Sequence, residues 1–438
     1  MIILRTVKNI SSLNIAASVL LFLAAILAAV VANSSLSPVY QDFLLQELHL
    51  RIGNFNLFSH GGHPLKMIEF INDCLMTVFF LAVGLEIKRE LLVGELSSVR
   101  KAALPFIAAC GGMVVPVVIY ALSVASGTPE TRGMAIPMAT DIAFSLGVLS
   151  LLGKRVPLSL KIFLTAFAVV DDIGGILVIA LFYSADVAYG YLIAAAVLYV
   201  FLYYMGKFGV TQKIFFLFFG VIIWYLFLQS GIHSTISGVI LAFVIPARPR
   251  LDAGKYIERI RDIIGEFPVS KSDNIVLTNA QIATLKQVER ASDYVISPLQ
   301  SLEDNLHGAV SFVILPLFAF ANAGVVFSGS GSIVGDVSIA VAAGLLLGKF
   351  LGIYLFTWLA VKSGVALMPA GMNWKNIAGV SLLGGIGFTV SLFIANLSFA
   401  DEYPELLNQA KFGVLVGTVL AGVLGYVVLN WVLPERKK

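Results

Sequence analysis

Residues 161–183 read KIFLTAFAVVDDIGGILVIALFY, an apolar stretch with two adjacent carboxylates, Asp171 and Asp172, at its centre. The stretch is long enough to cross a bilayer, since a membrane-spanning helix needs about 20 apolar residues. An ionisable group at bilayer depth is costly and marks an ion path or a proton relay. Two neighbouring acids repel each other unless protons or cations share their site. We therefore treat the rest of the chain as scaffold and access route for this pair.

The composition indicates an all-α polytopic membrane protein. The chain has 438 residues, of which 58% are hydrophobic and only 13% are charged, whereas a soluble domain carries about a quarter charged residues. We expect residues 1–438 to form a single transmembrane transporter domain of about twelve helices. The twelve apolar segments are about 12–33, 66–86, 103–124, 134–151, 158–183, 188–206, 213–229, 231–247, 308–327, 337–362, 376–399 and 411–432.

The distribution of positive charge predicts how these segments are oriented. An even number of spans puts both termini on one side, and 24 of the 29 Lys and Arg residues fall on that side, four fall on the other and Lys349 lies inside a segment. Because basic loops stay in the cytoplasm, we expect both termini to be cytoplasmic. Residues 34–65 then form a periplasmic loop with an amphipathic piece near 43–50. Residues 248–300 form a cytoplasmic loop with a surface helix near 253–264.

Two of the twelve segments carry residues that interrupt a helix. Segment four contains Pro137, Thr140 and Asp141, and segment eleven contains the sequence GGIG at 384–387. A shift of 244 residues aligns similar side chains of the two segments, which is weak support for an internal repeat. The segments are an odd number of spans apart, so they cross the membrane in opposite directions. Broken helices in inverted repeats indicate the midplane site of a transporter, where unwound backbone is tolerated because it lines a cavity.

The ionisable residues at this depth favour a site for a small cation. Lys349 is as central in segment ten as the Asp pair is in segment five, and a buried lysine needs an acid partner. Consecutive helix residues point about 100° apart, so one aspartate can face Lys349 while the other faces a water-filled funnel. Asp141 adds a third acid, and Thr140 adds a hydroxyl. Such hard oxygens suit a small hard cation. Three acids and a lysine at one depth favour this interpretation over structural ion pairs alone.

Six stretches of the sequence resemble the NhaA family of bacterial sodium/proton antiporters. They are FFLAVGLEIKRELLVGEL from residue 79, the run from AIPMATDIAFSLG to VVDDIGGILVIALFY over 135–183, SGIHSTISGVI from 230, ILPLFAFANAGV from 314, GLLLGKFLGI from 344 and GIGFTVSLFIA from 385. They occur in the family order and run from segment two to segment eleven, a span that takes in most of the chain. The resemblance implies twelve helices with two broken crossing helices, in the bacterial inner membrane.

The resemblance also assigns roles to particular residues. It implies that Asp171 and Asp172 bind the proton and the metal ion Na⁺, that Lys349 pairs with Asp171, and that Thr140 and Asp141 belong to the helix crossing. It implies a cytoplasmic pH-sensing region, onto which we carry four residues: Glu86, Glu90, Glu303 and His307. The chain departs from the family in its longer loop at 248–300 and in Asp304, where we expect histidine. Family members form homodimers through an outer hairpin, for which the loop at 34–65 is the counterpart.

We therefore expect an electrogenic, pH-regulated antiporter that exports Na⁺ or Li⁺ in exchange for protons and serves sodium and pH homeostasis. We expect no cofactor, no enzymatic activity and no nucleic-acid partner, only the lipid bilayer, a second copy of the chain and the transported ions. Two alternatives remain. An intramembrane aspartyl protease would use Asp141 and Asp172 as a catalytic pair, but this leaves Asp171 and Lys349 unexplained. A channel would need an open path in place of alternating access. The sequence does not decide between Na⁺, Li⁺ and K⁺.

Overall fold

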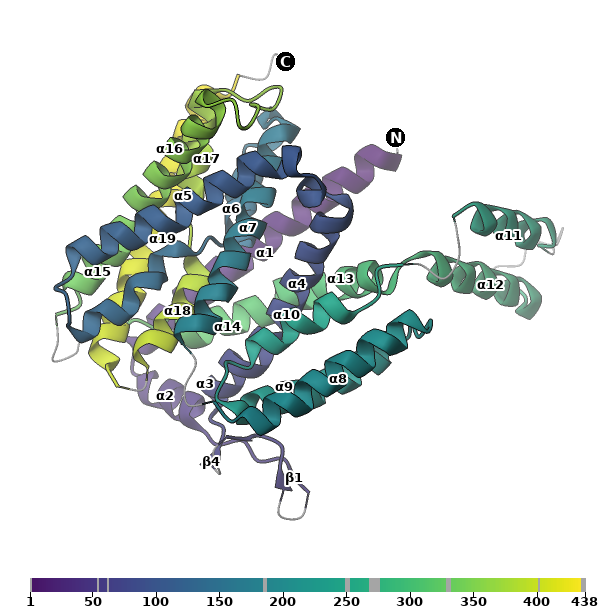
Figure 1. Ribbon diagram of the computed structural model, residues 1–438, viewed down its shortest axis with the longest axis horizontal. Helices are drawn as coiled ribbons and strands as arrows, with labels where there is room; N and C mark the ends of the chain where they lie inside the picture. Colours follow the sequence, from purple (N-terminus) through teal and green to yellow (C-terminus); the bar gives the residue numbers. More distant parts are fainter. Residues whose placement is uncertain are drawn as a thin grey trace.

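The computed structural model describes residues 2–52, 55–60, 63–183, 187–248, 253–267, 276–327, 332–400 and 402–434, and most of this chain is helical. The expected all-α fold class is confirmed. Figure 1 shows a bundle of long helices with short β-hairpins projecting from one end. We call that end the hairpin face. The opposite end, where α1 (Ile2–Ala32) begins and α19 (Pro404–Val432) ends, is the terminal face (Figure 1).

Nine helical stretches of the described chain are long and apolar enough to cross a membrane. The first lies in α1 and the last is α19. The other seven are α3 (Met67–Phe70) with η1 (Ile71–Leu75) and α4 (Met76–Val93); α5 (Val99–Ser123); α7 (Leu158–Phe182); α8 (Tyr189–Lys207); α9 (Lys213–Ser230); α13 (Pro298–Ala309) with η5 (Val310–Ile314) and α14 (Leu315–Asn322); and α15 (Asp336–Ala343) with η6 (Gly344–Gly348) and α16 (Lys349–Lys362). In the three composite stretches η1, η5 and η6 are π-helical turns, which the sequence did not predict.

Two further spans are broken, and they are the two that the sequence predicted. The 3₁₀ helix η3 (Pro129–Met138) meets α6 (Ile142–Leu151) at a bend of 45°, and α17 (Trp374–Leu383) meets α18 (Phe388–Phe399) at 43°. Their breaks fall at Ala139–Asp141 and at the glycine run 384–387. The half before the first break is a 3₁₀ helix that starts at residue 129, not at 134 as expected.

The remaining apolar segment forms α10 (Thr235–Val244), a shorter helix than the 17 residues expected from 231 to 247. With α10, the helical elements match the twelve predicted segments in order. Other boundaries differ as well, since α1 begins at Ile2 and not near 12, and α19 begins at Pro404 and not near 411. The difference that bears on the site is the start of segment nine. Its helix begins at Pro298, with the Ser297 hydroxyl accepting a hydrogen bond from the Gln300 backbone as an N-cap. Residues 298–307 were expected in the cytoplasmic loop or directly after it, but they belong to the helix that carries Glu303 and His307.

The two long loops contain their own short elements. On the hairpin face, α2 (Ser37–Leu45) ends before most of the piece expected near 43–50, and two antiparallel pairs follow. These pairs are β1 (Arg51–Ile52) with β2 (Phe55–Asn56), and β3 (Ser59–His60) with β4 (His63–Pro64). The second loop contains α11 (Ala253–Gly265), close to the surface helix expected there, and α12 (Asn279–Val295). The short 3₁₀ helices η2 (Glu95–Ser97) and η4 (Gly153–Arg155) complete the described elements. Parts of both loops lie outside the described residues.

Small residues bring the helix that carries Lys349 close to α5. Gly344, Gly348 and Gly352 recur every four residues, and a Cβ added at Gly348 would lie 2.6 Å from the Pro116 Cα atom. Such spacing lets the backbones of two membrane helices approach without side chains between them. The close contact with α5 thereby fixes the depth and rotation of Lys349.

Candidate functional site

The two broken spans cross at their breaks and bind each other through unwound backbone. The Asp141 backbone N–H donates to the Ile386 carbonyl over 2.6 Å, and the Thr140 hydroxyl donates to the Gly384 carbonyl over 2.7 Å. Glycines at 384, 385 and 387 disfavour continuous helix there. Backbone groups freed within a membrane must find partners inside the protein. Each break therefore supplies hydrogen-bond partners for groups in the other break. The two breaks meet at the crossing that was expected from the sequence.

Asp141 is held in place by hydrogen bonds on both carboxylate oxygens. Its Oδ1 accepts from the Phe144 backbone N–H over 3.0 Å and so caps the first turn of α6. Its Oδ2 accepts from the Thr389 hydroxyl over 2.6 Å and from the Thr389 backbone N–H over 3.2 Å. Sequence reasoning missed Thr389 as a site residue, although the 244-residue shift places it opposite Ser145. Asp141 is thus a carboxyl group held in one position at the crossing.

Lys349 and Asp171 form a fully buried ion pair. The Lys349 ammonium lies 2.7 Å from Asp171 Oδ2 and 2.9 Å from Oδ1, and neither side chain has any solvent exposure. Lys349 directly follows the π turn η6, whose extra residue sets the face of α16 on which the lysine lies. The ammonium also lies 5.6 Å from the centre of the Phe167 ring. The structure therefore brings together the lysine and the acid that the sequence analysis paired.

Asp172, the next residue of α7, points instead into a cavity of about 310 Å³. Thr140, Asp141 and Thr389 line the same cavity. Within the described residues, no group hydrogen-bonds the Asp172 carboxylate. A buried carboxylate without partners is costly unless a proton or a cation neutralises it. The two adjacent aspartates thus differ in kind, because one is neutralised by a lysine and the other faces an open space.

The cavity runs from Asp172 towards the residues carried over as pH sensors. Glu86, Glu303, Asp304 and His307 line it at its other end. Arg89 joins the remaining sensor to this group, since its guanidinium lies 2.9 Å from Glu303 and 3.1 Å from Glu90. Three of the four carried-over residues therefore line the cavity, and Glu90 is joined to them through Arg89.

The charged residues at the end of α4 contact neighbouring helices. Without these contacts, the charges at 86–90 would be interpreted as an ordinary solvated helix end. The Lys88 ammonium donates to the Phe243 carbonyl over 2.7 Å and to the Ile245 carbonyl. It thereby caps the last turn of α10 with a positive charge, where a helix dipole favours one. Lys88 thus fastens α4 to α10, and Arg89 fastens α4 to α13. These contacts join segments far apart in the chain, so the local sequence gave no signal for them.

The geometry suits transient binding of a hard cation more than a resident metal centre. Among the described residues, no group of three or more His, Cys, Asp or Glu side chains is arranged to hold a metal ion. Asp172 supplies carboxylate oxygens, and Thr140, Thr389 and the unwound backbone supply further oxygen atoms nearby. Oxygen ligands with one free carboxylate can bind an alkali cation and also release it.

The chain is similar to known proteins along nearly its whole length. Residues 8–429 match the family model described as Na⁺/H⁺ antiporter 1. A protein from Bacteroides thetaiotaomicron named Na⁺/H⁺ antiporter NhaA is 75% identical over 438 residues, which is the full length of both chains. Proteins of the same name from Parabacteroides distasonis and Porphyromonas gingivalis are 51% and 47% identical, over 100% and 98% of this chain and 98% and 96% of their own.

Proposed function

The chain belongs to the Na⁺/H⁺ antiporter 1 family, and on that premise we propose that it exchanges Na⁺ or Li⁺ for protons across a membrane. The observation that carries the proposal is the contrast between the two adjacent aspartates. Asp171 is paired with Lys349, whereas Asp172 faces a cavity without a bonded partner among the described residues. A single free carboxylate at the end of a cavity can accept either a proton or a cation.

The exchange follows from competition for one site. With Lys349 charged, the acids Asp141, Asp171 and Asp172 leave a net negative charge when all three are deprotonated. A cation offsets that charge, and so does a proton, but simultaneous occupation by both is disfavoured. Arrival of Na⁺ at Asp172 therefore releases protons, and arrival of protons releases Na⁺. The exchange is electrogenic when two protons leave for each Na⁺, one from Asp172 and the second from the Lys349–Asp171 pair.

Alternating access requires that the site faces one side at a time. The cavity that reaches Asp172 leads towards Glu303 and the terminal face. A separate gap lined by Phe80 and by Ile176, four residues after Asp172 on α7, has no room for a water molecule. The crossing of the broken helices is the element that moves, because it holds Asp141 and lines the cavity. Movement of the crossing against α4 and α10 opens the narrow side and closes the other.

The orientation, location and assembly follow from the same proposal. The terminal face, with both termini, lies in the cytoplasm of a bacterium, and the hairpin face lies in the periplasm, since the positive charge of the loops is concentrated on the former. The protein lies in the inner membrane and exports Na⁺ or Li⁺ as protons enter. Glu86, Glu90, Glu303 and His307 sense pH at the cytoplasmic mouth. Two copies associate through the hairpins of residues 34–65.

The two alternative functions fit the site less well. An aspartyl protease needs two carboxylates that share a proton, but the oxygens of Asp141 are engaged by Phe144 and Thr389. A channel needs a path open to both faces, but the gap beside Phe80 has no room for a water molecule. The engaged Asp141 oxygens and the narrow gap beside Phe80 are both expected of a transporter that is open towards the terminal face.

The function is tested with purified protein in proteoliposomes that contain a pH-sensitive dye. Addition of Na⁺ or Li⁺ to the wild type moves protons, whereas Asp172→Asn, which keeps the shape and removes the charge, gives only the background signal. Asp336→Asn is the matched control, because Asp336 is an exposed aspartate in the first turn of α15. It exchanges ions at the wild-type rate. Robust exchange by a well-folded Asp172→Asn protein would refute the assignment, and K⁺ is included to define the selectivity.

A further inference from the structure

A cavity of about 360 Å³ lies at the hairpin face and shares no lining residue with the cavity that reaches Asp172. It is enclosed by the end of α1, by α2, by the end of α14 and by the start of α19, and Figure 1 shows α2 at this face of the bundle. Its polar lining residues include Tyr40 of α2 and Glu405, Asn408 and Lys411 of α19. None of these four residues takes part in the exchange mechanism described above.

Hydrogen bonds between distant parts of the chain hold the walls of this cavity. The Tyr40 hydroxyl donates to the Phe320 carbonyl over 2.6 Å, which joins α2 to α14. The Asn408 side chain donates to the Val326 carbonyl over 2.8 Å and accepts from the Val326 backbone N–H over 3.0 Å. Asn33, which follows α1, bonds to the residues on either side of Val326 in the same way. The cavity is therefore built into the fold, with its walls fixed from three helices.

Lys411 supplies the positive charge of this cavity. Its side chain is half-buried, and among the described residues it forms no hydrogen bond and no ion pair. Other basic side chains at the hairpin face are paired, since Arg132 lies 2.9 Å from Glu402. Lys66 likewise lies 3.9 Å from Glu69. A partly buried ammonium that loses hydration without gaining a partner is costly. The position of Lys411 therefore favours an anionic group that comes from outside the chain.

The place of Lys411 along α19 gives its depth in the membrane. With 29 residues, α19 is roughly 43 Å long and extends at both ends beyond a hydrocarbon core of about 30 Å. Lys411 follows the first residue, Pro404, by seven positions or roughly 10 Å, which puts its Cα atom near the edge of that core. Helix side chains lean towards the N-terminus, and α19 begins at the hairpin face. The ammonium thus reaches the level of the lipid phosphates in that leaflet.

A second, apolar cavity of about 390 Å³ lies deeper in the membrane, between α1, α6 and α19. Phe22 of α1 and Thr418 and Gly422 of α19 are among its lining residues. Thr418 and Gly422 come seven and eleven positions after Lys411, so all three lie on one face of α19. An acyl chain attached to a headgroup at Lys411 can follow this face into the apolar cavity. The two cavities together therefore fit a lipid better than a water-soluble anion.

Glu405 adds a negative charge at the exposed rim of the first cavity. It forms no ion pair with Lys411, and within the described part of the chain no other group bonds its carboxylate. A ligand with a phosphate alone brings negative charge towards this carboxylate. A headgroup that carries both a phosphate and an ammonium has an opposite charge for each of the two residues.

We propose that this cavity binds a phospholipid from the leaflet at the hairpin face, with the lipid phosphate on Lys411 and an ammonium headgroup, as in phosphatidylethanolamine, at Glu405. Hydrogen bonds from an ammonium to a phosphate are about twice as strong as those between neutral groups. Basic pockets between membrane helices are known to bind lipid headgroups. The bound lipid stabilises the contacts between α1, α2, α14 and α19. The site lies outside the exchange mechanism, so the inference goes beyond the proposed function and does not depend on it.

The test measures lipid binding to the delipidated full-length protein in detergent by native mass spectrometry. The wild type binds one phosphatidylethanolamine more tightly than one phosphatidylglycerol, whose headgroup lacks the ammonium. Lys411→Met weakens the binding of both lipids about tenfold or more, because a hydrogen bond to a charged group is lost. Glu405→Gln weakens the binding of phosphatidylethanolamine alone, by about twofold to fivefold, as expected of an exposed ion pair.

Thermal melting separates this role of Lys411 from a merely structural one. Without added lipid, Lys411→Met melts at the wild-type temperature or above it, since the substitution removes a polar group that has no partner in the described chain. Added phosphatidylethanolamine raises the melting temperature of the wild type but not of this variant. If Lys411→Met does not fold, Leu44→Trp tests the same site, because it narrows the cavity from α2 and keeps the lysine. It likewise loses the bound lipid.

Lys66→Gln is the matched control for the loss of a positive charge at this face. Lys66 is 48% exposed, pairs with Glu69 and does not line the cavity. This variant binds both lipids as the wild type does. Glycerophosphoethanolamine, which has the same headgroup without acyl chains, is the second control. It binds far more weakly than the lipid, because it buries no apolar surface.

Each of four results would overturn the inference: equal lipid binding by the wild type and Lys411→Met, an equal loss in Lys66→Gln, an unchanged preference between the two lipids in Glu405→Gln, or equally tight binding of glycerophosphoethanolamine. The last result would identify a water-soluble ligand in place of a lipid. None of these measurements involves transport, so the proposed exchange of Na⁺ or Li⁺ for protons stands or fails separately.

Discussion

The ion pair between Lys349 and Asp171 allows a quantitative prediction about stability. Both side chains are fully buried, and the ammonium contacts both carboxylate oxygens at 2.7 and 2.9 Å. Removal of one member of such a pair leaves an uncompensated buried charge and costs about 3 to 5 kcal/mol. Lys349→Ala and Asp171→Asn should therefore each lower the melting temperature markedly. The loss in Lys349→Ala is the larger one, because the contact with the Phe167 ring disappears as well.

The double variant separates a true pair from two independent buried groups. Lys349→Ala with Asp171→Asn removes both charges, so no unpaired charge remains. Its loss should be smaller than the sum of the single losses by at least about 2 kcal/mol. Thermal melting of the four purified proteins in one detergent, at alkaline pH where a lone carboxyl cannot easily be protonated, gives the comparison.

An exposed ion pair provides the control for this cycle. Arg132 and Glu402 lie 2.9 Å apart, but their side chains are 51% and 57% exposed. The corresponding cycle should give a coupling of less than about 1 kcal/mol. If the losses at Lys349 and Asp171 simply add, to within about 0.5 kcal/mol, the two residues are not coupled and the lysine has another role.

Two further predictions concern packing and the helix crossing. Gly348→Val should lower the melting temperature and the yield of folded protein, since its Cβ would clash with the backbone of α5, while Gly190→Val, where no atom lies within 4 Å of the added Cβ, should not; equal losses would contradict the packing described. Thr389→Val removes a hydrogen bond to the Asp141 carboxylate that is worth about 1.5 to 3 kcal/mol, so it should weaken Na⁺-driven proton movement roughly tenfold or more. Thr357→Val is its control, since the buried Thr357 hydroxyl has no hydrogen-bond partner within the described residues, and it should transport normally with equal or higher stability.

The sequence predicted the elements of this fold better than the contacts between them. Apolar length and loop charge act locally, so they gave the helices in order, and the glycine run 384–387 marked a true break. The depth of Lys349 required an acid partner, and the adjacent aspartates offered one. The choice of Asp171 depends on the rotation of two helices whose residues lie 178 positions apart, and only the family resemblance supplied it.

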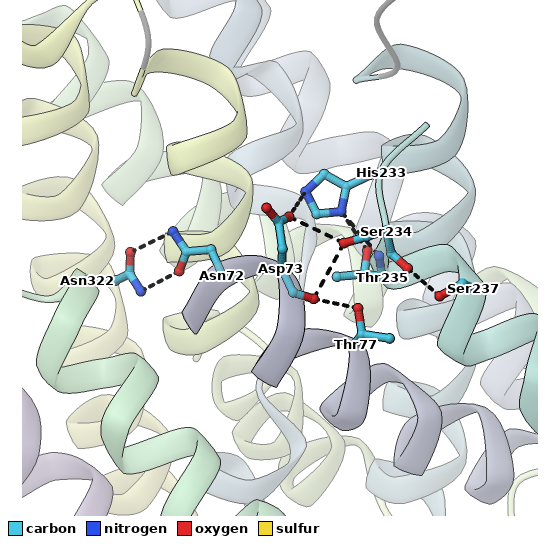
Figure 2. Close-up of polar contacts among 8 residues, drawn as sticks. All are labelled: Asn72, Asp73, Thr77, His233, Ser234, Thr235, Ser237 and Asn322. Carbon is cyan, nitrogen blue, oxygen red and sulfur yellow. Dashed lines mark hydrogen bonds and ion pairs between the residues drawn. The ribbon is translucent and has the colours of Figure 1, made fainter. Parts of the chain in front are cut away.

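The π turns are the clearest feature that local patterns did not give. Lys349 directly follows the turn η6, and within η1 Asn72 bonds to Asn322 whereas Asp73 lies near His233 (Figure 2). π turns are rare and occur mostly as single-turn bulges inside α-helices, and no local sequence pattern marked the three seen in this chain. The same holds for Arg89 and Thr389, whose partners are Glu303 and Asp141. Hydrophobic periodicity carries no information about such distant polar contacts.

The mutual hydrogen bonding of the two breaks also has a consequence for biosynthesis. The Thr140 hydroxyl binds the carbonyl of a residue that is made 244 positions later. At about 5 to 20 residues per second, the ribosome needs roughly 12 to 50 s to supply that partner. During this interval the unwound stretch at Ala139–Asp141 cannot be exposed to lipid, because free backbone groups are costly there. The growing chain must keep this stretch in water or against the insertion machinery, so a message truncated before α17 yields a protein whose first half cannot settle in the bilayer.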